Sequence, residues 1–148
     1  MMQTFLPYQN FIESAECLDR KRLSKQRVET WQILRTLLGY SEGWKNHPAV
    51  RMWKGYEIAL CFYGFAVCDE WIFRGYKDRL REKFLSILYG ESKEKRLQNF
   101  DGSLVFPPWL GDEAFHSSHR AALLAKDPDW YSQFGWTEEP KIDYVWPV

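Results

Sequence analysis

The sequence predicts an all-α fold: a single compact helical domain of residues 1–148 with long ordered loops and extended N- and C-terminal arms. Three observations support this. A length of 148 residues suits one domain with a sizeable core. Apolar residues at 45% and charged residues at 27% are ordinary for a globular chain, which excludes a disordered tail, a collagen-like fibre and a disulfide miniprotein. Helix-capping residues and terminal glycines bound most of the apolar segments.

The helices follow from these start and stop signals in chain order. Residues 1–9 read as an extended arm, and Asn10 with Glu13 has the form of a capping box. Asp19 is placed to cap the next helix, and Pro48 suits the first turn of a long one. We therefore expect helices that start at Phe11 and that cover Arg20–Leu38, Pro48 to about Gly75, Asp78–Leu88 and Asp112–Lys126.

The segments between and after the helices are expected to be irregular. Residues 40–46 form a polar loop, and turn signals between Asn99 and Leu110 indicate an ordered loop that can include a small hairpin. The last helix stops at Asp127, and residues 141–148 form an extended tail.

Cysteine usage and hydropathy indicate a reducing compartment. The three cysteines are an odd number without a C-x-x-C motif, which does not suit a disulfide framework. No signal peptide is evident, and the longest apolar stretch, Ile58–Cys68, is too short to span a bilayer. We expect a cytoplasmic monomer with no membrane partner.

The zero formal net charge hides an asymmetry between the two parts of the chain. Residues 1–100 carry 17 basic and 12 acidic side chains, whereas residues 101–148 carry 3 basic and 8 acidic ones. The densest basic run contains no acid and consists of Arg20, Lys21, Arg22, Lys25 and Arg27. A solvated helix face usually interleaves both signs, so this run is a candidate for nucleic-acid binding, although a positive patch without function fits the charge equally well.

One face of the Arg20–Leu38 helix could carry chemistry. On a helical wheel Arg22, Lys25 and Glu29 fall within one sector of about 80°, together with Gln32. In a cleft, Glu29 could act as a general acid or base while the two cations hold a phosphate. The alternative is a solvated face on which Lys25 and Glu29 pair locally at i,i+4.

Two histidines and the aromatic residues provide further candidates. His116 and His119 share a face of the last helix with Arg120, and contact with phosphate or base suits them better than a metal, because no supporting ligand has the right spacing. Histidines on the helix surface without a role fit the sequence better still. The aromatic content of 18% must be mostly core, but a ring such as Trp53 at a cleft rim could stack on a base. We expect no metal and no cofactor.

Five sequence blocks carry a family resemblance that covers nearly the whole chain. In order they are LDRKRLSKQRVE, NHPAVRMW, PPWLGDEAFHSSHR, DPDWYSQFGW and the closing YVWPV. Together they resemble the pyrimidine-dimer DNA glycosylase family, typified by a phage endonuclease that excises ultraviolet photoproducts. Residues 128–135 and Arg27–Val28 are similar to the phage enzyme itself.

The resemblance implies a compact all-α enzyme that couples a DNA glycosylase to an abasic-site lyase without a metal. In this family the N-terminal amine attacks the sugar C1′ and forms a Schiff base, assisted by a glutamate, while arginines hold phosphates of a kinked duplex. Here that amine would belong to Met1, or to Met2 if translation begins there. An α-amine with a pKa near 8 is a usable neutral nucleophile.

Only some of the family's functional residues have a counterpart in this sequence. Arg27–Val28 matches the second part of the phage pattern, and Arg22 matches its first arginine after a one-residue insertion. The position of the catalytic glutamate holds Leu23 or Ser24, so Glu29 is assigned by geometry as the nearest carboxylate on the Arg22 face.

Three classes of function therefore compete. The first and favoured one is a DNA repair glycosylase with lyase activity on double-stranded DNA that is damaged or abasic; its catalytic residues would be Met1, Arg22, Lys25 and Glu29. The second is an enzyme of the same fold that processes modified bases or nucleotides by other chemistry. The third is a non-catalytic DNA-binding module. The expected DNA surface comprises Arg20, Lys21, Arg27, Trp53, His116, His119 and Arg120.

Overall fold

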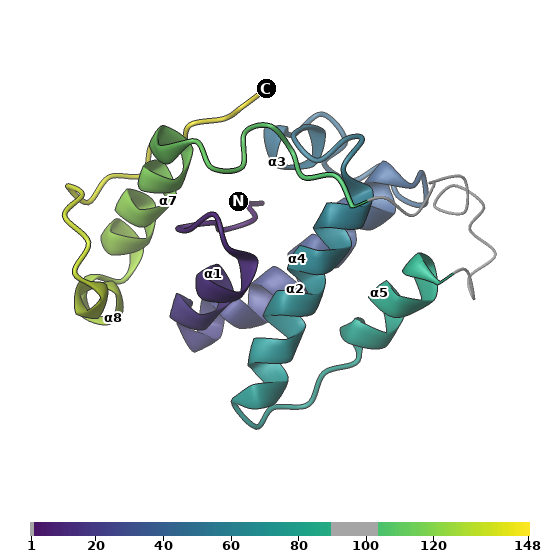
Figure 1. Ribbon diagram of the computed structural model, residues 1–148, viewed down its shortest axis with the longest axis horizontal. Coiled ribbons are helices and arrows are strands. Elements are labelled where there is room, and N and C mark those ends of the chain that lie inside the picture. The colour runs from purple at the N-terminus through teal and green to yellow at the C-terminus, as the bar shows by residue number, and fades with distance from the viewer. Residues whose placement is uncertain (1, 90–103) are drawn as a thin grey trace.

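The computed structural model describes residues 2–89 and 104–148, and its regular elements are helices (Figure 1). They are, in chain order, α1 (Phe11–Cys17), α2 (Arg20–Leu37), α3 (Pro48–Arg51), α4 (Glu57–Phe73), α5 (Leu80–Leu88), α7 (Glu113–Lys126), α8 (Pro128–Tyr131) and a short 3-10 helix, η1 (Ser132–Phe134). No strand occurs in these two ranges, and the all-α prediction is confirmed.

The predicted capping residues form the expected hydrogen bonds. The Asn10 side chain accepts the backbone N–H of Glu13 at 3.0 Å, and the Asp19 side chain caps α2. The helix expected to include Asp112 begins at Glu113 instead, because the Asp112 side chain caps it. These caps satisfy backbone donors that would otherwise be unpaired, which fixes the start of each helix.

The long helix expected between Pro48 and Gly75 is instead two helices, and that prediction was wrong. The chain leaves α3 at Arg51 and enters α4 at Glu57. Between them Gly55 has a φ of 90°, a left-handed conformation that interrupts a right-handed helix. The Glu57 side chain accepts the N–H of Gly55 at 3.1 Å and stabilises the break.

Other boundaries differ by smaller amounts. The helix expected from Asp78 begins at Leu80, because the Asp78 carboxylate accepts the N–H of Arg81 at 2.8 Å and acts as a cap. Asp127 ends α7 as predicted but also caps α8, which the sequence analysis missed. In the predicted loop, residues 99–103 lie outside the described residues, and 104–110 contain turns without a strand.

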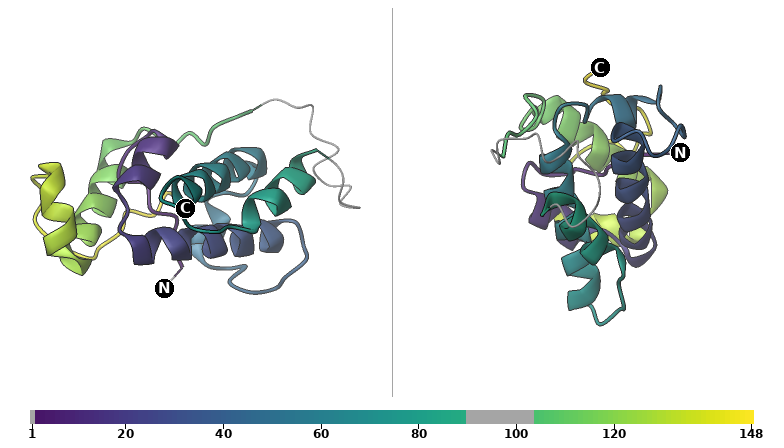
Figure 2. Two further views of the ribbon diagram at one scale, coloured as in Figure 1. Left: turned by 90° about the horizontal axis from the view of Figure 1, so that it is seen from below. Right: turned by 90° about the vertical axis from the view of Figure 1, so that its right-hand side faces the viewer.

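The helices pack around a core rich in aromatic side chains. In Figure 2, α2 and α4 lie side by side, with α1 and α5 against α4. A side chain at Gly64 of α4 would come within 2.6 Å of the Phe84 ring of α5, so glycine allows their close approach. Most of the large rings in the described residues are either buried or packed against the core, and the fully buried ones include Trp53, Tyr63, Phe84, Phe115 and Tyr131. None of the helices in the described ranges is long and apolar enough to cross a bilayer.

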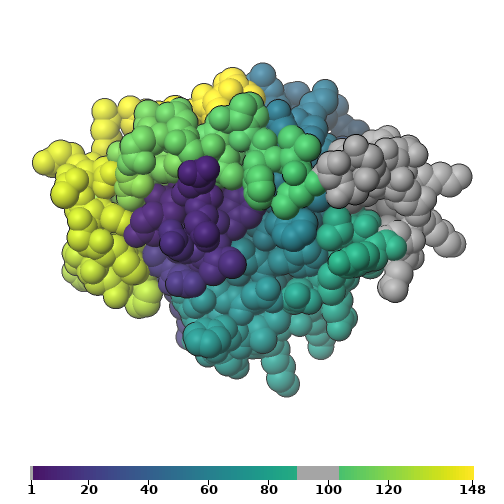
Figure 3. All heavy atoms as spheres, viewed as in Figure 1, coloured from purple at the N-terminus to yellow at the C-terminus, as the bar shows by residue number. Residues whose placement is uncertain are grey.

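The N-terminal arm lies inside the molecule. Residues 2–6 have exposed fractions between 0% and 7%. In Figure 1 the arm lies in the middle of the view between α7 and α4, and Figure 3 shows the purple N-terminal segment enclosed by green and teal segments. The C-terminal tail lies along α7, where the N–H of Lys141 donates to the Ala121 carbonyl at 3.1 Å. The arm therefore forms part of the core.

Candidate active site

Side chains of α2 and α4 hold the backbone of the buried arm. The Gln26 amide accepts the N–H of Phe5 at 2.8 Å and donates to the carbonyl of Gln3 at 2.8 Å. The Tyr63 hydroxyl donates to the Phe5 carbonyl at 2.7 Å. Because a buried backbone group without a partner is costly, these bonds make the arm's path specific.

Two histidines of α7 form hydrogen bonds with the backbone N–H and carbonyl groups of one arm residue, Leu6. The Leu6 N–H donates to Nδ1 of His119 at 2.9 Å, and Nδ1 of His116 donates to the Leu6 carbonyl at 2.7 Å. Nε2 of His116 accepts the Gly111 N–H at 2.9 Å, which assigns its proton to Nδ1. Burial, with a smaller contribution from His116, lowers the pKa of His119 to about 3. His119 therefore stays neutral and remains an acceptor for the arm.

These contacts correct the expected DNA surface. Trp53, His116 and His119 are at most 2% exposed, and the Trp53 indole donates to the Thr4 hydroxyl at 3.0 Å. Arg120 pairs with Glu113 and Glu138 and donates to the Pro7 carbonyl at 2.7 Å. All four hold the arm instead of facing solvent, because each finds its polar partners inside the protein.

Arg27 is also placed differently from the prediction. Its guanidinium pairs with Asp78 at 2.5 Å and lies 4.5 Å from the centre of the Trp71 ring. Its side chain is only 12% exposed, and the Asp78 side chain is fully buried. This pairing assigns Arg27 to the contact between α2 and the segment before α5, whereas Arg20 and Lys21 are exposed as expected.

The arm and the opposite side of α2 border a cavity of about 230 Å³ around Glu29, here called the Glu29 pocket. Glu29 accepts the N–H of Gln3 at 3.4 Å and the Gln26 amide at 3.2 Å. The arm therefore lies against α2 beside Glu29. The pocket is lined by Phe5, Lys21, Arg22, Lys25, Gln26, Glu29, Lys126 and Tyr144.

The Glu29 pocket holds an excess of positive charge. Lys21, Lys25 and Lys126 have no ion-pair partner among the residues described. Arg22 is paired with Asp19 at 3.2 Å. Burial and the nearby Arg22 and Lys25 lower the pKa of Lys126, so the pocket lacks enough negative charge for its cations. Such a site attracts phosphate.

Partial burial makes Glu29 a suitable proton donor or acceptor. Burial raises the pKa of its carboxyl, and the Gln3 N–H and Lys25 oppose that rise. A carboxyl held above its usual pKa can carry a proton closer to neutral pH, as a general acid or base must. The fourth predicted catalytic group, the amine of Met1, lies outside the described residues.

The sequence predicted the α2 residues of this pocket but not those from α7 and the C-terminal tail. Arg22, Lys25 and Glu29 come together as the helical wheel predicted. Lys126 and Tyr144 were missed, because they come from the end of α7 and from the tail and no local pattern connects them with α2. Burial, with Glu29 adding to it and Arg22 opposing it, raises the pKa of Tyr144 to about 12, so its hydroxyl stays protonated.

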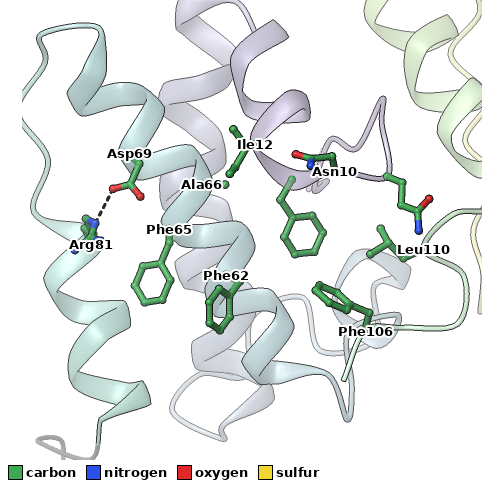
Figure 4. Close-up of a pocket in the computed structure, with 11 residues that line it drawn as sticks. Asn10, Ile12, Phe62, Phe65, Ala66, Asp69, Arg81, Phe106 and Leu110 are labelled. Carbon is green, nitrogen blue, oxygen red and sulfur yellow. Dashed lines mark hydrogen bonds and ion pairs between the residues drawn. The ribbon is translucent and has the colours of Figure 1, made fainter. Parts of the chain in front are cut away.

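A larger cavity of about 540 Å³ lies among α1, α4, α5 and residues 106–110 (Figure 4). Its walls are mainly aromatic and aliphatic, with Phe62, Phe65 and Phe106 pointing toward it. The charged residues that line it, Asp69 and Arg81, pair with each other at 2.6 Å. With its charges paired, this cavity has less capacity for acid–base chemistry than the Glu29 pocket.

The sequence model of the pyrimidine dimer DNA glycosylase family matches residues 2–83. The chain belongs to this family. The match covers the arm, α1 to α4 and the start of α5, and therefore every residue of the Glu29 pocket except Lys126 and Tyr144. No curated protein and no solved structure significantly matches this glycosylase-family chain. Membership assigns it to the DNA repair glycosylases, whose substrate is DNA.

Proposed function

We propose that this chain excises damaged pyrimidines, such as ultraviolet dimers, from double-stranded DNA and then acts as a lyase on the abasic site. The nucleophile is the N-terminal α-amine, with Met1 as its candidate carrier. The observation that carries the proposal is the buried arm, whose Gln3 N–H binds Glu29 in a cationic pocket.

Burial of the arm supports an N-terminal nucleophile because it holds residues 2–6 in a defined position beside Glu29. A free terminus is normally disordered, whereas this arm is held by side chains of α2, α4 and α7 up to Gln3. Ordering a nucleophile in advance removes much of the entropic cost of reaching its target. An α-amine with a pKa near 8 is also neutral far more often at pH 7 than a lysine amine.

Glu29 is proposed as the group that moves protons. As the amine nitrogen bonds to C1′, the bond between C1′ and the base breaks, and the departing base needs a proton or an equivalent stabilisation. Later steps remove and return protons on the opened sugar. A carboxyl with a raised pKa beside the arm suits both tasks.

The unpaired cations are proposed to hold the DNA backbone at the lesion. Lys21, Lys25 and Lys126 surround Glu29 on the pocket walls, and Arg22 is oriented by Asp19. Phosphate contacts of this kind position a duplex without reading its sequence, which suits an enzyme that recognises damage.

Borohydride trapping tests this proposal. The protein is incubated with an ultraviolet-irradiated duplex and with an abasic duplex, reduced, and digested for peptide mapping. We expect a covalent adduct on the N-terminal peptide. Lys21→Arg, Lys25→Arg and Lys126→Arg keep the charge but remove the lysine amines of the pocket, and we expect all three variants to form the same adduct.

The other outcomes discriminate among the competing functions. An adduct on the peptide of Lys21, Lys25 or Lys126 would contradict the N-terminal nucleophile. DNA binding without an adduct on either substrate would favour modified-base chemistry of another kind or a non-catalytic DNA-binding module.

A further inference from the structure

The turn between α4 and α5 exposes apolar side chains at one end of the molecule. Phe73 is 85% exposed, and its neighbours Ile72 and Tyr76 are 45% and 37% exposed. The turn is the lowest part of the molecule in Figure 1 and again in the right-hand view of Figure 2. Single exposed apolar residues are common, but a group of them at a projecting tip indicates a contact surface.

The backbone of this turn is held in a fixed conformation. The Trp71 indole donates to the carbonyl of Lys77 at 2.9 Å, and its ring stacks on that of Tyr76 with the centroids 4.2 Å apart. Gly75 has a φ of 94°, which allows the sharp reversal after α4. Asp78 anchors the far end of the turn through Arg27. The exposed rings therefore sit on a rigid support.

The same turn carries two exposed positive charges. Lys77 and Arg79 are exposed, and neither has an ion-pair partner in residues 2–89 or 104–148. Three nearby acids are already paired: Glu70 with Arg74, Asp78 with Arg27, and Asp69 with Arg81, whereas Glu82 in the first turn of α5 is exposed and has no ion pair among the described residues. Exposed rings between unpaired cations are complementary to a nucleic acid, which offers phosphates beside stacked bases.

The first turn of α2 links this surface with the Glu29 pocket. The guanidinium of Arg20 lies 5.8 Å from the centre of the Tyr76 ring, whereas the next two residues, Lys21 and Arg22, line the pocket. The turn and the pocket are therefore both bordered by the first turn of α2, so one duplex lying across α2 could contact both.

We propose that the turn of residues 72–79 is a second contact with double-stranded DNA. Lys77 and Arg79 bind phosphates, and Phe73 inserts between base pairs adjacent to the nucleotide held at the Glu29 pocket. Architectural DNA-binding proteins use apolar wedges of this kind to unstack a base step and bend the duplex. This inference rests on the proposed function, since it requires DNA at the pocket.

The insertion is tested with a duplex that contains a tetrahydrofuran abasic analogue and a 2-aminopurine near it, because the analogue prevents chemistry. Wild-type protein should raise the 2-aminopurine fluorescence several-fold, and Phe73→Ala should lose most of that rise at saturating protein. Ile12→Ala is the matched control, since Ile12 is 61% exposed on α1, and it should behave as wild type.

The phosphate contacts are tested by the salt dependence of binding to the same duplex. Lys77→Ala and Arg79→Ala should each reduce the logarithmic salt slope by about 0.9. Lys54→Ala is the control, since Lys54 is exposed between α3 and α4, and it should leave the slope unchanged.

Two failures remain distinguishable. If wild-type protein binds the duplex but Phe73→Ala gives the full fluorescence rise, the insertion is wrong while the proposed function stands. If Lys77→Ala and Arg79→Ala keep the wild-type slope, the turn is not a DNA contact. If the wild-type protein does not bind DNA at all, both the proposed function and this inference fall.

Discussion

The two sides of α2 carry the same kind of charge but differ in how that charge is compensated. On one side Arg27 is buried in an ion pair with Asp78 and against the Trp71 ring. On the other side Lys21 and Lys25 face the Glu29 pocket, and no described acid pairs with them. A single basic run in the sequence thus contains one structural cation and two that are available for a ligand.

The same contrast recurs along α7. Arg120 is held by two carboxylates and by the Pro7 carbonyl, whereas Lys126 reaches the Glu29 pocket without such a partner. The comparison shows that ion-pair partners, and not position in a charged run, distinguish the cations that stabilise the fold from those that remain available to a ligand.

The largest change in the free energy of unfolding is expected for Arg27, the cation that is buried in an ion pair. Arg27→Met leaves the fully buried Asp78 side chain without its partner, and such a loss costs about 3–5 kcal/mol. Lys25→Met, on the exposed side, should change the free energy of unfolding by no more than about 0.5 kcal/mol. Urea denaturation of both variants measures the difference, and equal losses would break the distinction between the two sides.

His119, which accepts the Leu6 N–H, should make the free energy of unfolding depend on pH. His119 has a folded pKa of about 3 against an ordinary value of 6.5, so the unfolded chain binds the extra proton between these limits. Stability should therefore fall as the pH falls through this window, by about 1.4 kcal/mol per pH unit.

His119→Asn isolates that effect, because the asparagine oxygen can still accept the Leu6 N–H but does not titrate. Its free energy of unfolding, measured from pH 7 to pH 4, should fall less steeply than that of the wild type. Parallel curves for the two proteins would show that His119 is not the titrating group.

The unpaired cations should affect DNA binding more than folding. Lys25→Ala and Lys126→Ala should each lower the logarithmic salt slope of duplex binding by about 0.9, because one phosphate contact is lost. Lys141→Ala is the control, since Lys141 is 71% exposed and paired with Asp143. If neither pocket variant changes the slope, the Glu29 pocket does not bind DNA phosphates.

The smallest expected effect is the loss of stability caused by ionisation of the partly buried Glu29. Because burial raises its pKa, the folded state binds this proton more tightly than the unfolded state, and stability falls as the pH rises through the raised pKa. Glu29→Gln should therefore melt slightly higher than the wild type at pH 8, with no difference below pH 4.5, where both side chains are neutral. A lower melting temperature at pH 8 would mean that the surrounding cations outweigh burial.

The fold was largely predictable because its helices carry local signals. Asn10 and Asp19 each cap the helix that the sequence assigned to them. The break after α3 was not predictable in this way, because the apolar pattern continues through Met52 and Trp53, and Gly55 alone marks the turn.

The residues of the candidate site were predictable only where they come from a single helix. Arg22, Lys25 and Glu29 share a face by helical geometry, so the wheel brought them together. The roles of His116 and His119 depend on a contact with Leu6 more than a hundred positions away along the chain, and residue type alone suggested surface contacts instead. Such long-range partners are set by tertiary packing and have no local pattern.

The central claim is that Glu29, at the end of the buried arm, moves the protons of base excision. The most direct measurement is the single-turnover rate of base release from irradiated duplex at saturating protein, where differences in affinity no longer contribute. Glu29→Gln should release base about 100-fold more slowly, the scale expected for losing an acid–base group, while the exposed control Glu42→Gln keeps the wild-type rate. A wild-type rate in Glu29→Gln would contradict the account.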